Sequence, residues 1–207
     1  MPDDKTIFDL LHPQPLLIVI SGTSGVGKDS VIDGLKRRGL PLHFVITATS
    51  RQPRKNELHG RDYFFYPRDD FEQRIANNEF LEYANVYSDL KGIPRTQVED
   101  AMAKGVDVVA KVDVQGAATL RRLFPQALLI FIAPGSFDEW YTRLLRRNTE
   151  NQQDLNLRIK TARDEVKQIG MFDYVVVNRE NQIEKTVDDL VAIINAEHLA
   201  VNPKRIG

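Results

Sequence analysis

A glycine-rich segment that ends in lysine, residues 22–30, contains the residues best suited to chemistry. Three spaced glycines let the backbone curl so that several N–H groups point into one concavity, and the lysine adds a mobile positive charge for phosphate oxygens. A helix beginning near the lysine would add its positive end. We therefore expect a phosphate-binding loop composed of Gly22, Thr23, Ser24, Gly25, Val26, Gly27, Lys28, Asp29 and Ser30.

One position departs from the usual form of such a loop. Asp29 stands where a hydroxyl residue normally binds Mg²⁺, and Ser30 follows one place later. The alternative for the whole segment is an ordinary glycine-containing turn. The order of strand, glycines, lysine and helix favours phosphate binding, so Asp29 weakens the case only for the metal contacts.

The elements on either side of the loop must position it. The apolar run 16–20 has strand length, and Val31, Ile32 and Leu35 recur at helical spacing after it. Strands and helices then alternate, which predicts an α/β fold with a central parallel sheet covered by helices on both faces. Expected strands are 43–47, 63–66, 79–87, 106–112, 127–132 and 174–177, and expected helices are 29–38, 94–104, 136–147, 155–169 and 182–199, with short helices from Asp69 and up to Leu123. Ligands of such sheets bind at the carboxyl ends of the strands, where the loop, Asp113 and Asn178 fall.

A second group of charges lies between Thr47 and Tyr63. Arg51 and Arg54 flank a stiffening proline, and two guanidinium groups at that spacing suit a second phosphate. A solvated basic loop is the alternative, and the residues alone leave both interpretations open.

Composition limits the classes of function. The chain has 207 residues and a formal net charge of −1, so no overall basic field favours nucleic acid or an anionic membrane. Cysteine is absent and the four histidines are scattered, which argues against disulfides and thiolate or histidine metal sites. Neither a secretory signal nor an apolar run of spanning length is evident, so we expect a soluble cytoplasmic protein.

Eight segments together resemble the guanylate kinase family over roughly residues 16–198. The specific part is Arg51-Gln-Pro-Arg54 followed by Tyr63-Phe-Phe, since the glycine loop alone would suit many kinases. The other segments that carry the resemblance are 21–28, 78–82, 112–116, 143–147, 157–159 and 175–178. The resemblance implies a P-loop nucleoside monophosphate kinase that transfers the γ-phosphoryl group of Mg·ATP to GMP or dGMP.

The resemblance also implies a role for each matching residue. Lys28, Arg143, Arg147 and Arg158 would act in catalysis, and Asn178 would join the loop in binding ATP. The acceptor nucleotide would contact Thr47, Arg51, Arg54, Glu57, Tyr63, Glu82, Lys91, Gly92 and Asp113. Glu82 has a chemical reason for its role, because a carboxylate can accept from both N1–H and the 2-amino group of guanine, whereas adenine offers no such pair.

The implied organisation is one domain, 16–207, after a flexible tail, 1–15. Its core would comprise 16–47, 94–146 and 159–200, with an acceptor-binding insertion at 48–93 and a mobile lid at 147–158. Small-molecule nucleotides would be the ligands, and the oligomeric state, monomer or homodimer, stays open.

The chain departs from the family pattern at several site positions. A phosphate-binding phenol becomes Lys91, a guanine-reading hydroxyl becomes Ile93, and one of two paired acids becomes Lys111. We therefore expect Asp29, with Asp113, to bind Mg²⁺, or Asp29 instead to pair with Lys111. Two other functions remain as alternatives. The Gly-Lys-Asp-Ser form of the loop resembles ribose 1,5-bisphosphate phosphokinases, and a non-catalytic guanylate-kinase-like module would bind phosphorylated ligands.

Overall fold

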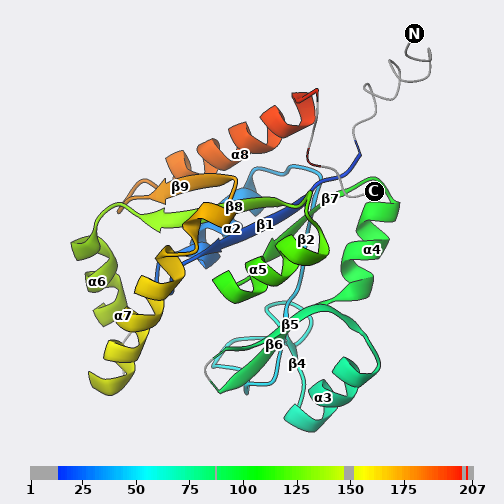
Figure 1. Ribbon diagram of the computed structural model, residues 1–207, viewed down its shortest axis with the longest axis horizontal. Helices are drawn as coiled ribbons and strands as arrows, with labels where there is room; N and C mark the ends of the chain where they lie inside the picture. Colours follow the sequence, from blue (N-terminus) through cyan, green and yellow to red (C-terminus); the bar gives the residue numbers. More distant parts are fainter. Residues whose placement is uncertain (1–13, 87, 147–151, 202–203, 205–207) are drawn as a thin grey trace.

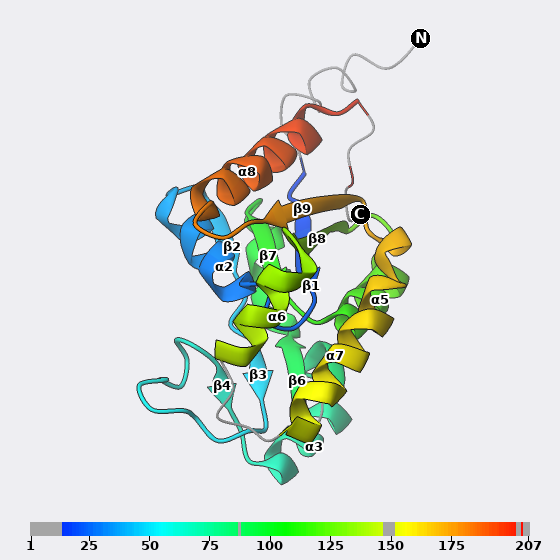
Figure 2. The same ribbon diagram turned by 90° about the vertical axis from the view of Figure 1, so that its left-hand side faces the viewer.

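Five parallel strands form the central sheet of the protein (Figures 1 and 2). The computed structural model describes residues 14–86, 88–146, 152–201 and 204, and it describes the side chains of all of these except 146 and 152–158. In spatial order the strands are β2 (Leu42–Phe44), β7 (Asp107–Lys111), β1 (Leu17–Gly22), β8 (Leu128–Pro134) and β9 (Tyr174–Asn178). The α/β class expected from the alternation is confirmed.

The central strand β1 explains the apolar run that precedes the glycine loop. It pairs with β7 on one side and β8 on the other, and all six of its residues are buried. A strand covered on both faces has no solvated side, so its sequence shows a continuous apolar run and no alternation. The strand ends at Gly22, and the loop therefore emerges from the middle of the sheet.

Helices cover both faces of this sheet. On one face, α2 (Lys28–Arg37) and α8 (Ile183–Leu199) bury Leu35 and Leu190 in a cluster with residues of β1 and β8. On the other, α4 (Arg95–Ala103) and α5 (Val114–Leu123) bury Val98 and Leu120. Within the described ranges, no helix combines the length and apolar composition that crossing a membrane requires.

A second, smaller sheet lies below the first in Figure 1 and is mixed. Its strands, in spatial order, are β4 (Phe64–Phe65), β3 (Ala48–Thr49), β6 (Asp89–Pro94) and β5 (Phe80–Val86), with α3 (Arg68–Ala76) packed beside them. The sequence reading missed β3 and β6. Both strands contain polar or glycine residues and form by pairing, β6 antiparallel with β5 and with β3, so local composition does not reveal them.

Two helices stand beside the carboxyl ends of the strands of the large sheet. They are α6 (Phe137–Arg146) and α7 (Gln152–Val166), and a short 3₁₀ helix, Ile169–Met171, follows α7. The expected helix 155–169 therefore begins three residues earlier and ends three earlier. Of the lid expected at 147–158, residues 147–151 lie outside the described residues, and 152–158 form the first turns of α7. Residues 1–13 of the expected tail also lie outside them.

Candidate active site

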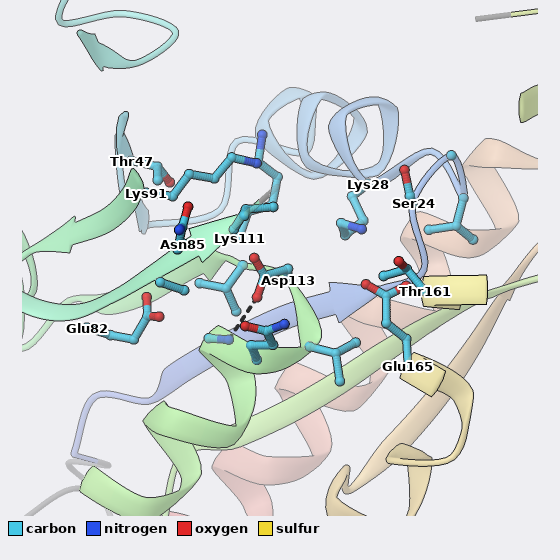
Figure 3. Close-up of a pocket in the computed structure, with 18 of the residues that line it drawn as sticks. Ser24, Lys28, Thr47, Glu82, Asn85, Lys91, Lys111, Asp113, Thr161 and Glu165 are labelled. Carbon is cyan, nitrogen blue, oxygen red and sulfur yellow. Dashed lines mark hydrogen bonds between the residues drawn. The ribbon is translucent and has the colours of Figure 1, made fainter. Parts of the chain in front are cut away.

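A cavity of about 450 Å³ opens between the large sheet, the small sheet and α7. Figure 3 shows the side chains that surround it, with Lys28 and Ser24 on one side and Glu82 and Thr47 on the other. Residues from five parts of the chain line it: the loop at 24–29, Thr47 and Tyr63, the small-sheet residues Glu82, Asn85, Lys91 and Gly92, the strand-end residues Lys111 and Asp113, and Thr161 and Glu165 of α7. The cavity thus joins the expected phosphate loop to the expected acceptor residues.

The glycines of the loop adopt conformations that other residues rarely reach. Gly25 and Gly27 have φ values of 82° and 95°. Glycine takes these values without the steric cost of a Cβ atom. A Cβ on Gly27 would also stand 2.7 Å from the amide nitrogen of Asn178. The spacing of the glycines therefore reflects both backbone conformation and close packing.

Carbonyl groups of the loop are occupied by contacts from inside the protein. The ammonium of Lys28 donates to the carbonyls of Gly22 at 2.5 Å and Thr23 at 3.1 Å. The indole of Trp140 donates to the Ser24 carbonyl at 2.8 Å. Carbonyls held in this way do not face the anion-binding side of the loop, where the Ser24 N–H already interacts with a carboxylate, that of Glu165.

Val26 shows the same arrangement on the outer side of the loop. Its carbonyl accepts from the amide of Asn178 at 2.8 Å and from Arg143 at 3.2 Å. The other end of the Asn178 amide accepts from the hydroxyl of Thr186 at 3.2 Å. Asn178 and Arg143, with Ser30, line a second cavity of about 320 Å³ behind the loop. In this structure the side chains of Asn178 and Arg143 hold the loop in place through the Val26 carbonyl.

Lys28 lies in an environment that opposes its charge. Its pKa is lowered to about 8: burial lowers it most and Lys91 adds to this, while the carboxylates of Glu165, Asp29 and Asp113 act in the opposite direction. A phosphate group bound beside it would favour the charged form. A bound anion therefore stabilises the charged form of Lys28 more than it would stabilise that of an exposed lysine.

Asp29 pairs with Lys111. The Lys111 ammonium lies 2.5 Å from Oδ1 of Asp29 and 5.5 Å from the centre of the Tyr63 ring. Burial lowers the pKa of Lys111, but Tyr63 and Asp29 raise it more, so the pKa lies above its ordinary value. Of the two roles expected for Asp29, the structure contains the pairing with Lys111.

Glu82 is the buried carboxylate on the opposite side of the cavity. Only 5% of the residue is exposed, and Oε1 is buried with no hydrogen-bond partner within the described part of the chain. Burial raises the pKa of Glu82 to about 8, and the nearby Asp113 carboxylate adds to the rise. A buried acceptor without a donor is costly, so this atom is suited to a ligand that brings one.

Asp113 has a structural contact of its own. It caps α5, with Oδ1 accepting from the Gly116 amide at 2.8 Å. Gly116 leaves room for Glu82, because a Cβ there would stand 3.1 Å from Oε1. The start of α5 therefore helps to shape the pocket around Glu82.

The expected acceptor arginines lie at the edge of the cavity. Arg51 forms a two-bonded ion pair with Glu57, with N–O distances of 2.6 and 2.7 Å, and its guanidinium stands 4.9 Å from the centre of the Tyr63 ring. The ion pair raises the pKa of Arg51 and lowers that of Glu57. Of the residues in this segment, Tyr63 lines the cavity, whereas Arg51, Glu57 and the exposed Arg54 do not.

Ile93, which stands where the resemblance implies a guanine-reading hydroxyl, lies opposite Glu82 in the pairing of β5 and β6. It is 1% exposed, packs in the core with Leu81 and Val98, and is absent from the lining of the cavity. Its neighbours Lys91 and Gly92 do line it. In this structure the isoleucine at position 93 is therefore a core residue.

Two of the expected lid arginines cannot be placed. Arg147 lies outside the described residues, and the side chain of Arg158 is not described, so Arg143 alone of the three has an observed position. Sequence reasoning also missed Glu165 and Trp140. Both residues contact the loop because α6 and α7 pack against it, and no local sequence motif predicts that packing.

A glycine loop after the central strand of a five-stranded parallel sheet, beside a small sheet that carries a buried carboxylate, defines the P-loop kinase class. A family model described as guanylate kinase matches residues 14–197. Guanylate kinase 2, chloroplastic/mitochondrial, of Oryza sativa is 47% identical over 94% of this chain and 69% of its own length. Guanylate kinase of Bacillus subtilis is 41% identical over 89% of this chain and 90% of its own length.

A solved structure agrees with these sequences. The crystal structure of guanylate kinase from Anaplasma phagocytophilum has a TM-score of 0.76 and 29% identity, over 91% of this chain and 89% of that one. The chain belongs to the guanylate kinase family. The alternative of a ribose 1,5-bisphosphate phosphokinase, which rested on the form of the loop, gains no support from these comparisons.

Proposed function

We propose that this protein is a guanylate kinase, which transfers the γ-phosphoryl group of ATP to GMP and forms GDP and ADP. Family membership at 36–47% identity over most of the chain supports the activity. The observation in the structure that carries the proposal is Glu82. Its buried, unpartnered oxygen stands in the same cavity as the phosphate loop, where guanine can supply two N–H donors.

The donor nucleotide would bind at the loop. Its phosphates would accept from the loop amides and from the ammonium of Lys28, with the positive end of α2 behind them. The second cavity, lined by Ser30 and Asn178, lies directly behind the loop and is the proposed place for the donor base. Arg143 would contribute charge near the transferring group after moving from the Val26 carbonyl, and Arg147 and Arg158 would do so from the lid.

The acceptor would bind between the two sheets. Thr47, Tyr63 and Lys91 line this part of the cavity, and Arg51 stands against Tyr63 with its orientation fixed by Glu57. We propose that Tyr63, Lys91, Arg51 and Arg54 hold the acceptor phosphate, and that Gly92 lets the base approach the sheet. Because Arg51 and Arg54 do not line the cavity, this requires the small sheet to close on the ligand.

The chemistry that Mg²⁺ would supply here is neutralisation of the negative charge on the donor phosphates. In the described part of the chain, no three acidic, histidine or cysteine side chains form a metal cluster. That agrees with Mg²⁺ in kinases, which is held by one or two carboxylates together with substrate phosphates and water. Asp29 and Asp113 are the carboxylates that would hold it, and Asp29 would have to leave Lys111. Asp29→Ser would then raise the Mg²⁺ concentration needed for half-maximal rate, and an unchanged requirement would refute this role.

The protein has little bond chemistry to perform. The acceptor phosphate is already an oxyanion, so no general base is needed, and catalysis consists of aligning donor and acceptor, stabilising charge with Lys28 and the arginines, and excluding water. Glu82 fixes the acceptor at the far end of the cavity and thereby aims its phosphate toward the loop.

An acceptor panel tests this proposal. ADP release is measured with ATP and Mg²⁺ and, in turn, GMP, dGMP, AMP, UMP and ribose 1,5-bisphosphate. We expect turnover with GMP and dGMP. Turnover with ribose 1,5-bisphosphate alone would identify a ribose 1,5-bisphosphate phosphokinase. No ADP release with any acceptor, although the protein binds ATP, would identify the non-catalytic module. The cytoplasmic location and the oligomeric state stay predictions.

A further inference from the structure

Ser24 of the phosphate loop is contacted from two sides by α6 and α7. Trp140 of α6 donates to its carbonyl at 2.8 Å, and the backbone N–H of Ser24 interacts with the Glu165 carboxylate of α7. Figure 3 shows Glu165 and Ser24 on the same side of the cavity. Trp140 and Leu144 pack with Ala162, so the two helices are joined by a small apolar cluster. The loop, α6 and α7 are therefore in contact with one another around Ser24.

The carboxylate of Glu165 lies beside Ser24 with one of its two oxygens lacking a hydrogen bond. Its Oε2 is buried and has no hydrogen-bond partner among the described residues. It contributes the largest electrostatic stabilisation of the Lys28 charge, although the Lys28 ammonium itself donates to the carbonyls of Gly22 and Thr23. Burial raises the pKa of Glu165 to about 6, against the effects of Lys28 and Ser24, so the group is mainly ionised at neutral pH.

These surroundings are the ones that a phosphate group would use. A loop amide and the loop lysine attract any anion placed between them. The Glu165 carboxylate contacts the Ser24 amide and lines the same cavity as Lys28, so it satisfies part of that attraction and repels a phosphate that enters the loop.

We propose that Glu165 is an internal anion that occupies the phosphate loop in the nucleotide-free protein and must be displaced when the donor phosphates bind. This rests on the proposed donor role of the loop. Displacement of Glu165 would move α7 away from Ser24 and alter the packing of Trp140 on the same residue. Glu165 thus sets the affinity for the donor and couples donor binding to the position of α6 and α7.

Two measurements on the full chain test this. Trp140 is the single tryptophan, so intrinsic fluorescence reports its surroundings directly. In the wild-type protein, ATP or inorganic tripolyphosphate should shift the emission. In Glu165→Gln, which keeps the shape and removes the charge, the emission of the free protein should already lie toward the ATP-bound value. Removal of one nearby negative charge should also strengthen ATP binding by at least about fivefold.

Asp164→Asn is the matched control, because it removes the same charge one residue earlier in α7, where the carboxylate also borders the cavity but is exposed and paired with Lys167 at 2.7 Å. Its ATP affinity should stay within about twofold of wild type. The proposal is overturned if Glu165→Gln, folded by circular dichroism, binds ATP no more tightly than wild type, or if ATP leaves the wild-type emission unchanged. Failure of wild type to bind ATP at all would instead refute the donor site.

Discussion

Glu82 provides the sharpest prediction, because its burial has a measurable consequence in protons. With a pKa raised to about 8, the free protein at pH 7 carries a proton on Glu82 in most molecules. Guanine offers N–H donors to this site, so it binds the ionised carboxylate. GMP binding at pH 7 should therefore release about 0.9 protons from Glu82. Isothermal titration calorimetry in buffers of different ionisation enthalpy measures this number.

Stability gives an independent magnitude for the same group. The folded state binds the Glu82 proton more tightly than the unfolded state, whose pKa is near 4.5, so the free energy of unfolding falls as pH rises from that value toward about 8. The loss between pH 5 and pH 8 is on the order of 3 kcal/mol. Glu82→Gln has no such group and should remove this part of the pH dependence in urea unfolding experiments.

The same variant tests the role of the carboxylate in recognition. Glutamine retains one acceptor and turns the other into a donor that faces the donors of guanine, so we expect kcat/KM for GMP to fall by about two orders of magnitude. Protons released when GMP binds Glu82→Gln come from other groups, which makes it the calorimetric control. Equal proton release in both proteins, together with a kcat/KM for GMP within twofold of wild type, would refute the assignment of Glu82.

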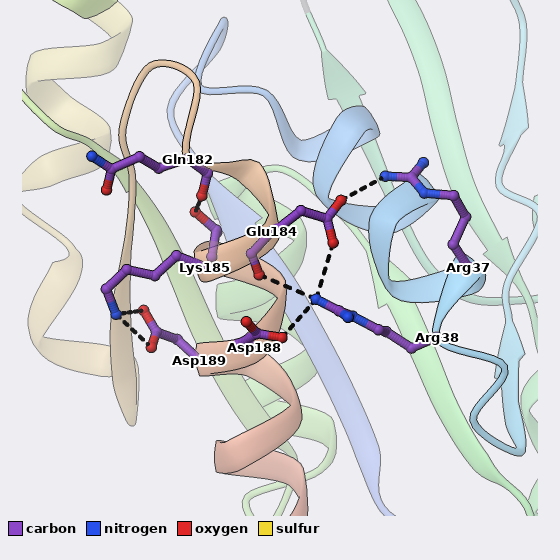
Figure 4. A network of polar contacts seen from close by, with 8 residues as sticks. Arg37, Arg38, Gln182, Glu184, Lys185, Asp188 and Asp189 are labelled. Atoms are coloured by element: carbon purple, nitrogen blue, oxygen red, sulfur yellow. Dashed lines mark hydrogen bonds and ion pairs between the residues drawn. The ribbon is translucent and has the colours of Figure 1, made fainter.

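Further predictions concern the loop, its ion pair and the surface. Gly22 has a φ of 145°, and a Cβ there would stand 2.3 Å from a carbonyl oxygen of β8, so Gly22→Ala should lower the free energy of unfolding by about 3 kcal/mol or more. Gly39→Ala, with no neighbour within 4 Å of the added Cβ, should cost about 1 kcal/mol, and equal losses would contradict the packing argument. In a double-mutant cycle of stability, Asp29→Ser and Lys111→Met should couple by about 0.5–1 kcal/mol, because Asp29 is 60% exposed, and zero coupling would show that the pair is absent in solution. Figure 4 shows the exposed network in which Arg38 contacts two carboxylates of α8, and Arg38→Ala should cost less than about 1 kcal/mol in the same assay.

Much of the fold follows from local patterns. The buried strand β1 and the helix α2 after it show an apolar run and helical spacing in the sequence. The helix has the expected limits within one residue, and the strand begins one residue later and ends two residues later than the apolar run. Strands β3 and β6 show no such pattern in the sequence. They are held by pairing with distant residues: β3 is only two residues long, and β6 carries Lys91 and Gly92, types that are depleted in strands.

The residues of the site also fall into two groups, those that local sequence patterns reveal and those that only tertiary packing positions. Lys28 begins the helix after β1, Glu82 lies within β5 and Asp113 follows β7, all elements that the sequence reveals, and the structure brings the three residues into one cavity. The bulge between Phe80 and Glu82 sets which residues of β5 and β6 face each other and pairs Glu82 with Ile93, and such a detail of pairing has no sequence signature. The contact of Glu165 with the loop depends on how α7 packs, which is a tertiary feature.

The most direct test of the central claim follows the phosphoryl group itself. ATP labelled in its γ-phosphate is incubated with the protein, Mg²⁺ and GMP, and the products are separated and analysed for label. We predict that the label appears in the β-phosphate of GDP and that Lys28→Met abolishes its appearance. Label released as inorganic phosphate, or remaining in ATP while the wild-type protein binds both nucleotides, would contradict phosphoryl transfer to GMP.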